Sequence, residues 1–177
     1  MVLTTYNSRT SQRMNKYKVI KGPAIMLSLE EEIALTRIIG SIIRSKNFHC
    51  LVYNICVDHV HMVIVCAYKE LSGIILRIKS ESSRNFRRHK FSKRPLSNQK
   101  REHLWSQKFF TADLDVWQIA TLSKQPGMLY KEDHLDHTIS YITSNRKKHG
   151  LRLSNELSEV IQSFLKNQDE AFAEEYE

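Results

Sequence analysis

The stretch CLVYNICVDHVHMVIVC, residues 50–66, decides the fold of this chain. Two apolar runs, 48–57 and 59–66, are rich in valine, isoleucine and tyrosine, and only a tight turn near Asp58 separates them. This composition and spacing predict a β-hairpin that is buried on at least one face. Because side chains alternate across a strand, His59 and His61 should project from one face and Val60 from the other.

The two histidines of this hairpin are candidate metal ligands. Two neutral imidazoles on the same face of a strand can hold a divalent cation. The alternative is a pair of surface histidines on a half-exposed strand, and the motif alone does not decide between the two.

The three cysteines, Cys50, Cys56 and Cys66, lie in the same apolar sequence. With the histidines they raise the alternative of a structural zinc site, but their spacing matches no standard finger or ribbon. Cysteines in apolar strands are usually reduced packing residues, which is the interpretation we favour.

Helical periodicity flanks the hairpin on both sides. Ser28 and Glu31 form a capping box, and apolar residues then recur at three- and four-residue spacing over 29–46. The same patterns predict helices at 70–89, at 132–149 with Gly150 as the stop, and in the tail from Ser154. The remaining predictions are weak strand pieces at 4–6 and 17–20, a basic loop at 90–102, a strand at 103–114 and an ambiguous stretch at 115–131. Strands and helices interleave around one hairpin, so the predicted fold class is α+β, with an antiparallel sheet covered by helices.

The helix at 132–149 carries a second set of candidate site residues. Tyr141 and Asn145 are four residues apart and share one helical face, while Leu135, Ile139 and Ile142 form the apolar side. An asparagine amide oxygen is a suitable ligand for Mg²⁺ or Mn²⁺. The alternative is a half-buried tyrosine beside a solvent-facing asparagine.

The charge of the chain points to a polyanionic partner. The net charge is +8, but residues 156–177 hold seven acids and one base, which leaves +14 on residues 1–155. A body this basic is expected to attract nucleic acid. No apolar run is long enough to span a bilayer and no signal-peptide core is present, so we expect a cytoplasmic protein without a membrane partner.

The basic residues are densest between residues 77 and 101, where ten of 25 residues are lysine or arginine. The candidate DNA-binding residues are Lys79, Arg84, Arg87, Arg88, Lys90, Lys93 and Arg94. Phe86, Phe91 and Trp105 are aromatics on which unpaired bases could stack. The alternative for Phe86 and Trp105 is core packing, which we favour for Trp105.

Four motifs, in this order along the chain, resemble those of one family. Residues 57–64, VDHVHMVI, resemble the His-hydrophobe-His motif of the HUH endonucleases. Residues 78–86 and 104–107 resemble the family's basic helix and its Leu-Trp strand, and residues 141–151, YITSNRKKHGL, resemble its catalytic-tyrosine helix. The chain therefore resembles the single-tyrosine HUH transposases of the IS200/IS605-like group, which includes the REP-associated tyrosine transposases. Two departures are Val57, where the family commonly has proline, and Arg146, where proline often follows the asparagine.

This resemblance implies a fold, a site and a substrate. The fold would be the ferredoxin-like HUH endonuclease fold over residues 1–153, with a helical tail at 154–177. Tyr141 would be the nucleophile, and His59, His61 and Asn145 would hold Mg²⁺ or Mn²⁺. The substrate would be single-stranded or hairpin DNA, nicked and rejoined through a 5′-phosphotyrosine link, which implies association with the nucleoid.

Some relatives dimerise and exchange the tyrosine helix, whereas the REP-associated branch can act as monomers. Two alternatives stay open. One is a catalytically idle protein or repressor that binds hairpin DNA. The other is a related replication initiator nuclease, which the short chain without a helicase or origin-binding extension disfavours.

Overall fold

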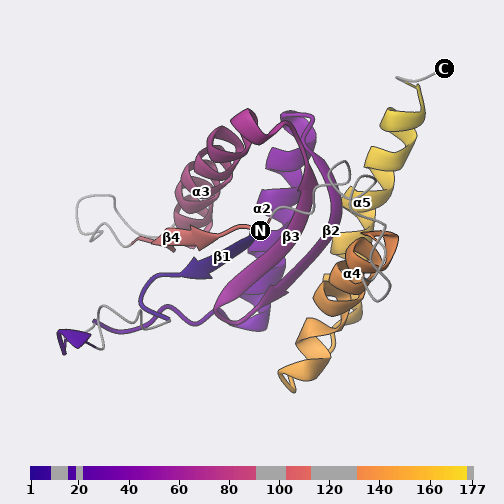
Figure 1. Ribbon diagram of the computed structural model, residues 1–177. Helices are drawn as coiled ribbons and strands as arrows, with labels where there is room; N and C mark the ends of the chain where they lie inside the picture. The colour runs from indigo at the N-terminus through magenta and orange to yellow at the C-terminus, as the bar shows by residue number, and fades with distance from the viewer. Residues whose placement is uncertain (9–15, 19–21, 91–102, 113–130, 175–177) are drawn as a thin grey trace, which may run out of the picture.

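The computed structural model describes residues 1–8, 16–18, 22–90, 103–112 and 131–174, which form an antiparallel sheet flanked by helices (Figure 1). The strands are β1 (Val2–Thr5), β2 (His49–Cys56), β3 (His59–Val65) and β4 (Trp105–Phe110). The helices are α2 (Leu29–Ser45), α3 (Tyr68–Lys90), α4 (Lys131–Lys148) and α5 (Asn155–Glu174). The predicted α+β class is confirmed.

The strand order in the described sheet is β2-β3-β1-β4, and each neighbouring pair is antiparallel. The predicted hairpin is therefore β2–β3, and β1 pairs with the other edge of β3. His59 lies opposite Cys56 on β2 and Thr4 on β1, so both histidine positions belong to an inner strand. The weak strand predicted at 4–6 is β1 at Val2–Thr5, whereas Tyr17 and Lys18 form a turn rather than a strand.

The two faces of the sheet differ in what covers them. Val60 and Met62 of β3 enter the main hydrophobic core, which α2 and α3 close from one face. On the other face Val52 and Val63 meet Ile142 of α4 in a smaller apolar cluster that includes the predicted stripe of Leu135 and Ile139. Figure 1 shows α2 behind the sheet and α4 beside β2. The histidines share the α4 face, as the strand alternation predicts.

Helix α2 connects the core to the end of the chain. It begins at the capping box of Ser28 and Glu31, in which each residue's side chain accepts a hydrogen bond from the other's backbone N–H. The predicted tail helix is α5, which packs against α2 and buries Leu157 and Phe164 in the main core. The Phe164 side chain lies against Gly40 of α2.

Base stacking on Phe86 or Trp105 is contradicted, because their side chains are only 4% and 5% exposed. Phe86 falls on the buried face of α3, one helical turn after Ser82 and two after Ile78. The Trp105 ring is fixed in the core by its Nε1, which donates to Ser82 Oγ at 2.9 Å. Core packing is therefore correct for both residues.

Several predicted segments fall outside the described residues. They are most of the basic loop (91–102, with Phe91) and almost all of the ambiguous stretch (113–130). The strand predicted at 103–114 is shorter, at Trp105–Phe110. None of the described helices combines the length and the apolar character needed to cross a membrane.

Candidate active site

His59 and His61 lie next to each other on the α4 face of β3. Their ring centroids are 4.8 Å apart and the rings are nearly perpendicular. His59 is buried, at 2% exposed, whereas His61 is half-buried. The strand alternation predicted this shared face, because residues i and i+2 of a strand point the same way.

The hydrogen bonds of His59 define which ring nitrogen is available to a ligand. Asp58 Oδ1 lies 2.5 Å from Nδ1, and a carboxylate can only accept, so Nδ1 carries the proton. The Asn145 Nδ2 amide lies 3.0 Å from Nε2 and donates to it. Nε2 therefore presents its lone pair toward α4. The sequence predicted Asp58 only as a turn residue. That Asp58 directly precedes His59 is the sequence feature that indicates its role in orienting the His59 ring.

Helix α4 brings the other two candidate residues to the histidines in the same chain. The Tyr141 ring lies 5.8 Å from the His61 ring between centroids, and the Tyr141 side chain is 47% exposed. Asn145 is buried against His59, and its Nδ2 is also 3.7 Å from Cys56 Sγ. The structure therefore places His59, His61, Tyr141 and Asn145 together.

The last residue of α4 and the residue directly after it also reach this centre, and neither was predicted. The Lys148 ammonium lies 4.3 Å from the centroid of the Tyr141 ring, a cation–π contact. The His149 ring lies 5.4 Å from the His59 ring between centroids. Both follow Tyr141 by two helical turns, and this spacing was the available sequence signal.

The candidate donors for a divalent cation are two imidazoles and one carboxamide. Among the residues that the structure describes, no three His, Cys, Asp or Glu side chains gather in a way that could hold a metal ion. A three-ligand site at the histidine pair therefore needs a third donor of another type, and the Asn145 carboxamide lies against His59 Nε2. A half-turn of the carboxamide exchanges its nitrogen for its oxygen, which is a suitable donor for Mg²⁺ or Mn²⁺.

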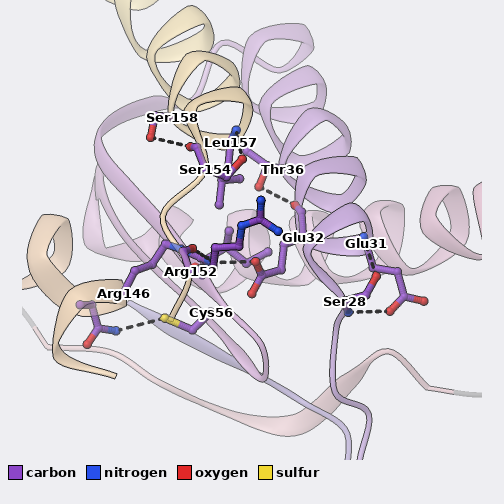
Figure 2. A network of polar contacts seen from close by, with 12 residues as sticks. Ser28, Glu31, Glu32, Thr36, Cys56, Arg146, Arg152, Ser154, Leu157 and Ser158 are labelled. Carbon is purple, nitrogen blue, oxygen red and sulfur yellow. Dashed lines mark hydrogen bonds and ion pairs between the residues drawn. The ribbon is translucent and has the colours of Figure 1, made fainter. Parts of the chain in front are cut away.

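Polar contacts hold α4 against β2. Asn54 lies opposite His61 in the hairpin, and its Nδ2 donates to Ile142 O at 2.5 Å. Arg146 crosses from α4 to Glu32 of α2 (Figure 2), and it also donates a hydrogen bond to the Ile55 carbonyl of β2. The helix ends near Gly150, whose φ of 63° is in the left-handed region that glycine tolerates, as predicted for the stop.

A cavity of about 580 Å³ opens beside Tyr141 and His61. It lies between α4, the end of β4 and the start of α3, with Val63, Ile142 and Phe110 on its apolar side. Its volume lies within the range of about 300–1,000 Å³ that is usual for ligand sites. The tyrosine and the exposed side of the histidine pair are thus accessible to a substrate.

The predicted DNA-binding residues on α3 differ in what they contact. The Lys79 ammonium donates to the carbonyls of Ser106 and Gln107 on β4, at 2.7 and 2.9 Å, and burial lowers its pKa. Lys90 forms an ion pair with Glu31 at 2.8 Å. Arg84 and Arg88 are exposed, Arg87 is half-buried, and Lys93 and Arg94 lie outside the described residues. Helix α3 covers the sheet face opposite α4, so these residues lie on a different face from Tyr141.

A comparison with known families identifies the class to which this fold and site belong. The model of the family described as "Transposase IS200 like" matches residues 13–124. The chain therefore belongs to the IS200-like transposase family, and its general role is that of a transposase acting on DNA. The matched stretch contains α2, β2, β3, α3 and β4, with both histidines, and ends before α4. Searches of curated proteins and of solved structures find no significant match.

Proposed function

We propose that this transposase nicks and rejoins single-stranded DNA at hairpin-marked sites, with Tyr141 as the nucleophile. The observation that carries the proposal is the meeting of a half-exposed tyrosine with a histidine pair and an asparagine at one end of an open cavity. A tyrosine, two imidazoles and an amide in one place match the needs of phosphodiester cleavage through a covalent link.

In the proposed reaction the Tyr141 phenol oxygen attacks the scissile phosphorus and loses its proton. The bond between phosphorus and the 3′-oxygen breaks, and that oxygen leaves as a 3′-hydroxyl after taking up a proton. The product is a 5′-phosphotyrosine link, so the phosphoester energy stays in the protein–DNA bond and no ATP is needed. A phenol with a pKa of about 10 is a good leaving group, so the 3′-hydroxyl of a second strand can reverse the step.

The surrounding residues would orient these groups. Asp58 holds the His59 ring with Nε2 facing α4, and Asn145 closes the space next to it. When bound by His59, His61 and Asn145, Mg²⁺ or Mn²⁺ would polarise the scissile phosphate and offset its developing charge. The Lys148 ammonium over the Tyr141 ring adds positive charge near the attacking oxygen. The exposed Arg84 and Arg88 would bind the DNA backbone away from the site.

A covalent-adduct assay tests this proposal. The probe is a set of single-stranded DNA fragments copied from the sequences that flank the coding region, each containing an inverted repeat and labelled at its 3′ end. With Mg²⁺ or Mn²⁺ we expect a labelled protein band that survives denaturation, and a free 3′-hydroxyl fragment when the label is at the 5′ end. Tyr141→Phe should form no adduct, whereas the matched control Tyr17→Phe, at an exposed turn, should equal wild type.

The alternatives predict different results in the same assay. A wild-type protein that binds the hairpin without forming an adduct would be a DNA-binding protein or repressor that performs no chemistry. An adduct that persists in Tyr141→Phe would assign the nucleophile to another residue and refute the proposal.

A further inference from the structure

We infer that a buried ion pair between Arg146 and Glu32 fixes the docking position of the tyrosine helix and so sets the positions of Asn145 and Tyr141; this inference rests on the proposed function. Arg146 directly follows Asn145 on α4, and Glu32 lies in the first turn of α2. Both residues would act through their neighbours, as positioning residues rather than catalytic ones.

The contacts of Arg146 join α4 to two other elements. Its Nη1 lies 2.8 Å from Glu32 Oε2 and also donates to the Ile55 carbonyl of β2 at 2.8 Å. Its Nη2 donates to the Arg152 carbonyl, at 2.8 Å, in the segment that leads into α5. Figure 2 shows the Arg146 side chain reaching Glu32 beneath the start of α5. Arg146 is 7% exposed and Glu32 is 1% exposed.

These contacts set the register of α4 against the histidine strand. Ile55 pairs with Val60, the residue between His59 and His61, and the adjacent Asn54 pairs with His61. Asn54 holds the Ile142 carbonyl of α4, and the Ile55 carbonyl holds Arg146 one helical turn later. A helix that slid by one residue would rotate by about 100° and carry Tyr141 away from His61. Asn54 and Ile55 of β2 therefore determine where Tyr141 lies relative to the two histidines.

The charges of the pair favour this docking position of α4 over others. If α4 docked at another position or register, the carboxylate of Glu32 would lose its cation while still in the core, which is strongly unfavourable. The pair is not built for greatest stability, since Glu32 Oε1 and Arg146 Nε are buried and have no hydrogen-bond partner among the residues that the structure describes. Buried ion pairs often contribute less to stability than apolar side chains of similar volume. Its main consequence is therefore specificity of docking.

The test replaces the pair by apolar side chains in Glu32→Leu/Arg146→Met. This variant should unfold at a urea concentration similar to wild type, because both charges are removed together. Amide hydrogen exchange should nevertheless become faster in α4 while α2 and the sheet stay protected. Mn²⁺ binding, measured by calorimetry without DNA, should weaken by about 10- to 100-fold, as is usual when residues that orient ligands are removed. Adduct formation should fall by a similar factor.

The matched control is the ion pair of Arg37 and Glu156, which joins α2 to α5 at the same distance of 2.8 Å but is 59% and 57% exposed. Arg37→Met/Glu156→Leu should leave exchange, Mn²⁺ affinity and adduct yield unchanged. Arg146→Lys is the conservative variant, because it keeps the charge for Glu32 but not the fork that reaches two carbonyls. It should give the same loss to a smaller degree, and it serves as the test if the apolar variant does not fold.

Unchanged exchange in α4 together with wild-type Mn²⁺ affinity, in a folded variant, would overturn the inference. If wild type itself forms no adduct, only the proposed function is refuted. The exchange comparison needs neither metal nor DNA and tests the ion pair by itself.

Discussion

The contact between Gly40 and Phe164 allows a quantitative test of how α5 is attached to the body. A Cβ added at Gly40 would lie 2.8 Å from Cδ1 and 2.9 Å from Cγ of Phe164. Carbon atoms at van der Waals contact are about 3.5–4.0 Å apart, so an alanine at position 40 must displace the ring. Phe164 is 1% exposed and stacks edge-on against Tyr53, with the centroids 5.3 Å apart. It therefore has little room to move.

We predict that Gly40→Ala changes stability in opposite directions in two backgrounds. In the native chain the substitution gains about 1 kcal/mol of helix propensity, while overpacking costs about 1–3 kcal/mol. The free energy of unfolding should therefore fall by about 0–2 kcal/mol. Phe164→Ala alone should lower it by about 3–5 kcal/mol. With the ring absent, Gly40→Ala should raise the free energy of unfolding by about 1 kcal/mol.

The assay is urea unfolding of wild type, both single variants and the double variant, followed by circular dichroism and tryptophan fluorescence. The coupling energy between the two sites should be about 1–3 kcal/mol. Leu153→Ala, at a residue that is 72% exposed, is the control and should stay within about 0.5 kcal/mol of wild type. Additive effects of the two substitutions, or a loss below about 1 kcal/mol for Phe164→Ala, would show that α5 does not dock on α2 as described.

Two further predictions concern the basic surface and a buried thiol. Arg88→Ala should leave stability unchanged but weaken DNA binding, and the slope of log affinity against log salt concentration should fall by about one. Lys79→Met should instead lower the free energy of unfolding by about 1–3 kcal/mol, because two carbonyls of β4 lose their donor. Salt titrations measure the effect on DNA binding, and urea unfolding measures the effect on stability. An unchanged free energy of unfolding in Lys79→Met would contradict the contact of Lys79 with β4. Burial raises the pKa of the Cys50 thiol to about 12, so the folded chain keeps a proton that the unfolded chain releases from about pH 8.5. The free energy of unfolding should therefore fall as pH rises from about 8.5 toward 12, and this slope should be smaller in Cys50→Ala; equal slopes would mean that the thiol is not buried.

The elements that local sequence specifies were predicted well. Helix α2, the β2–β3 hairpin and helix α4 have boundaries within a residue or two of the prediction, because capping, turn and periodicity signals lie within each segment. The first strand was only weakly indicated. Its place between β3 and β4 depends on partners more than fifty residues away.

The candidate site was predictable in its residue types but not in its contacts. The alternation of β3 places His59 and His61 on one face, and helical spacing places Tyr141 and Asn145 on one face. Lys79 and Lys90 were predicted to bind DNA from their charge, and only the fold shows that each ammonium already has a partner in the protein. The same reasoning applies to Phe86, because the sequence of a basic helix does not show which face an aromatic side chain occupies or whether it is buried.

What the sequence by itself determined is the set of local geometries, because alternation along a strand and rotation along a helix are properties of the backbone. It also determined the family, through motifs that keep their order along the chain. Only the tertiary structure decided where the tyrosine helix docks relative to the histidines. That choice depends on contacts between segments far apart, from Asn54 to Ile142 and from Arg146 to Glu32. The free energy of such contacts depends on burial, and burial exists only after the chain has folded.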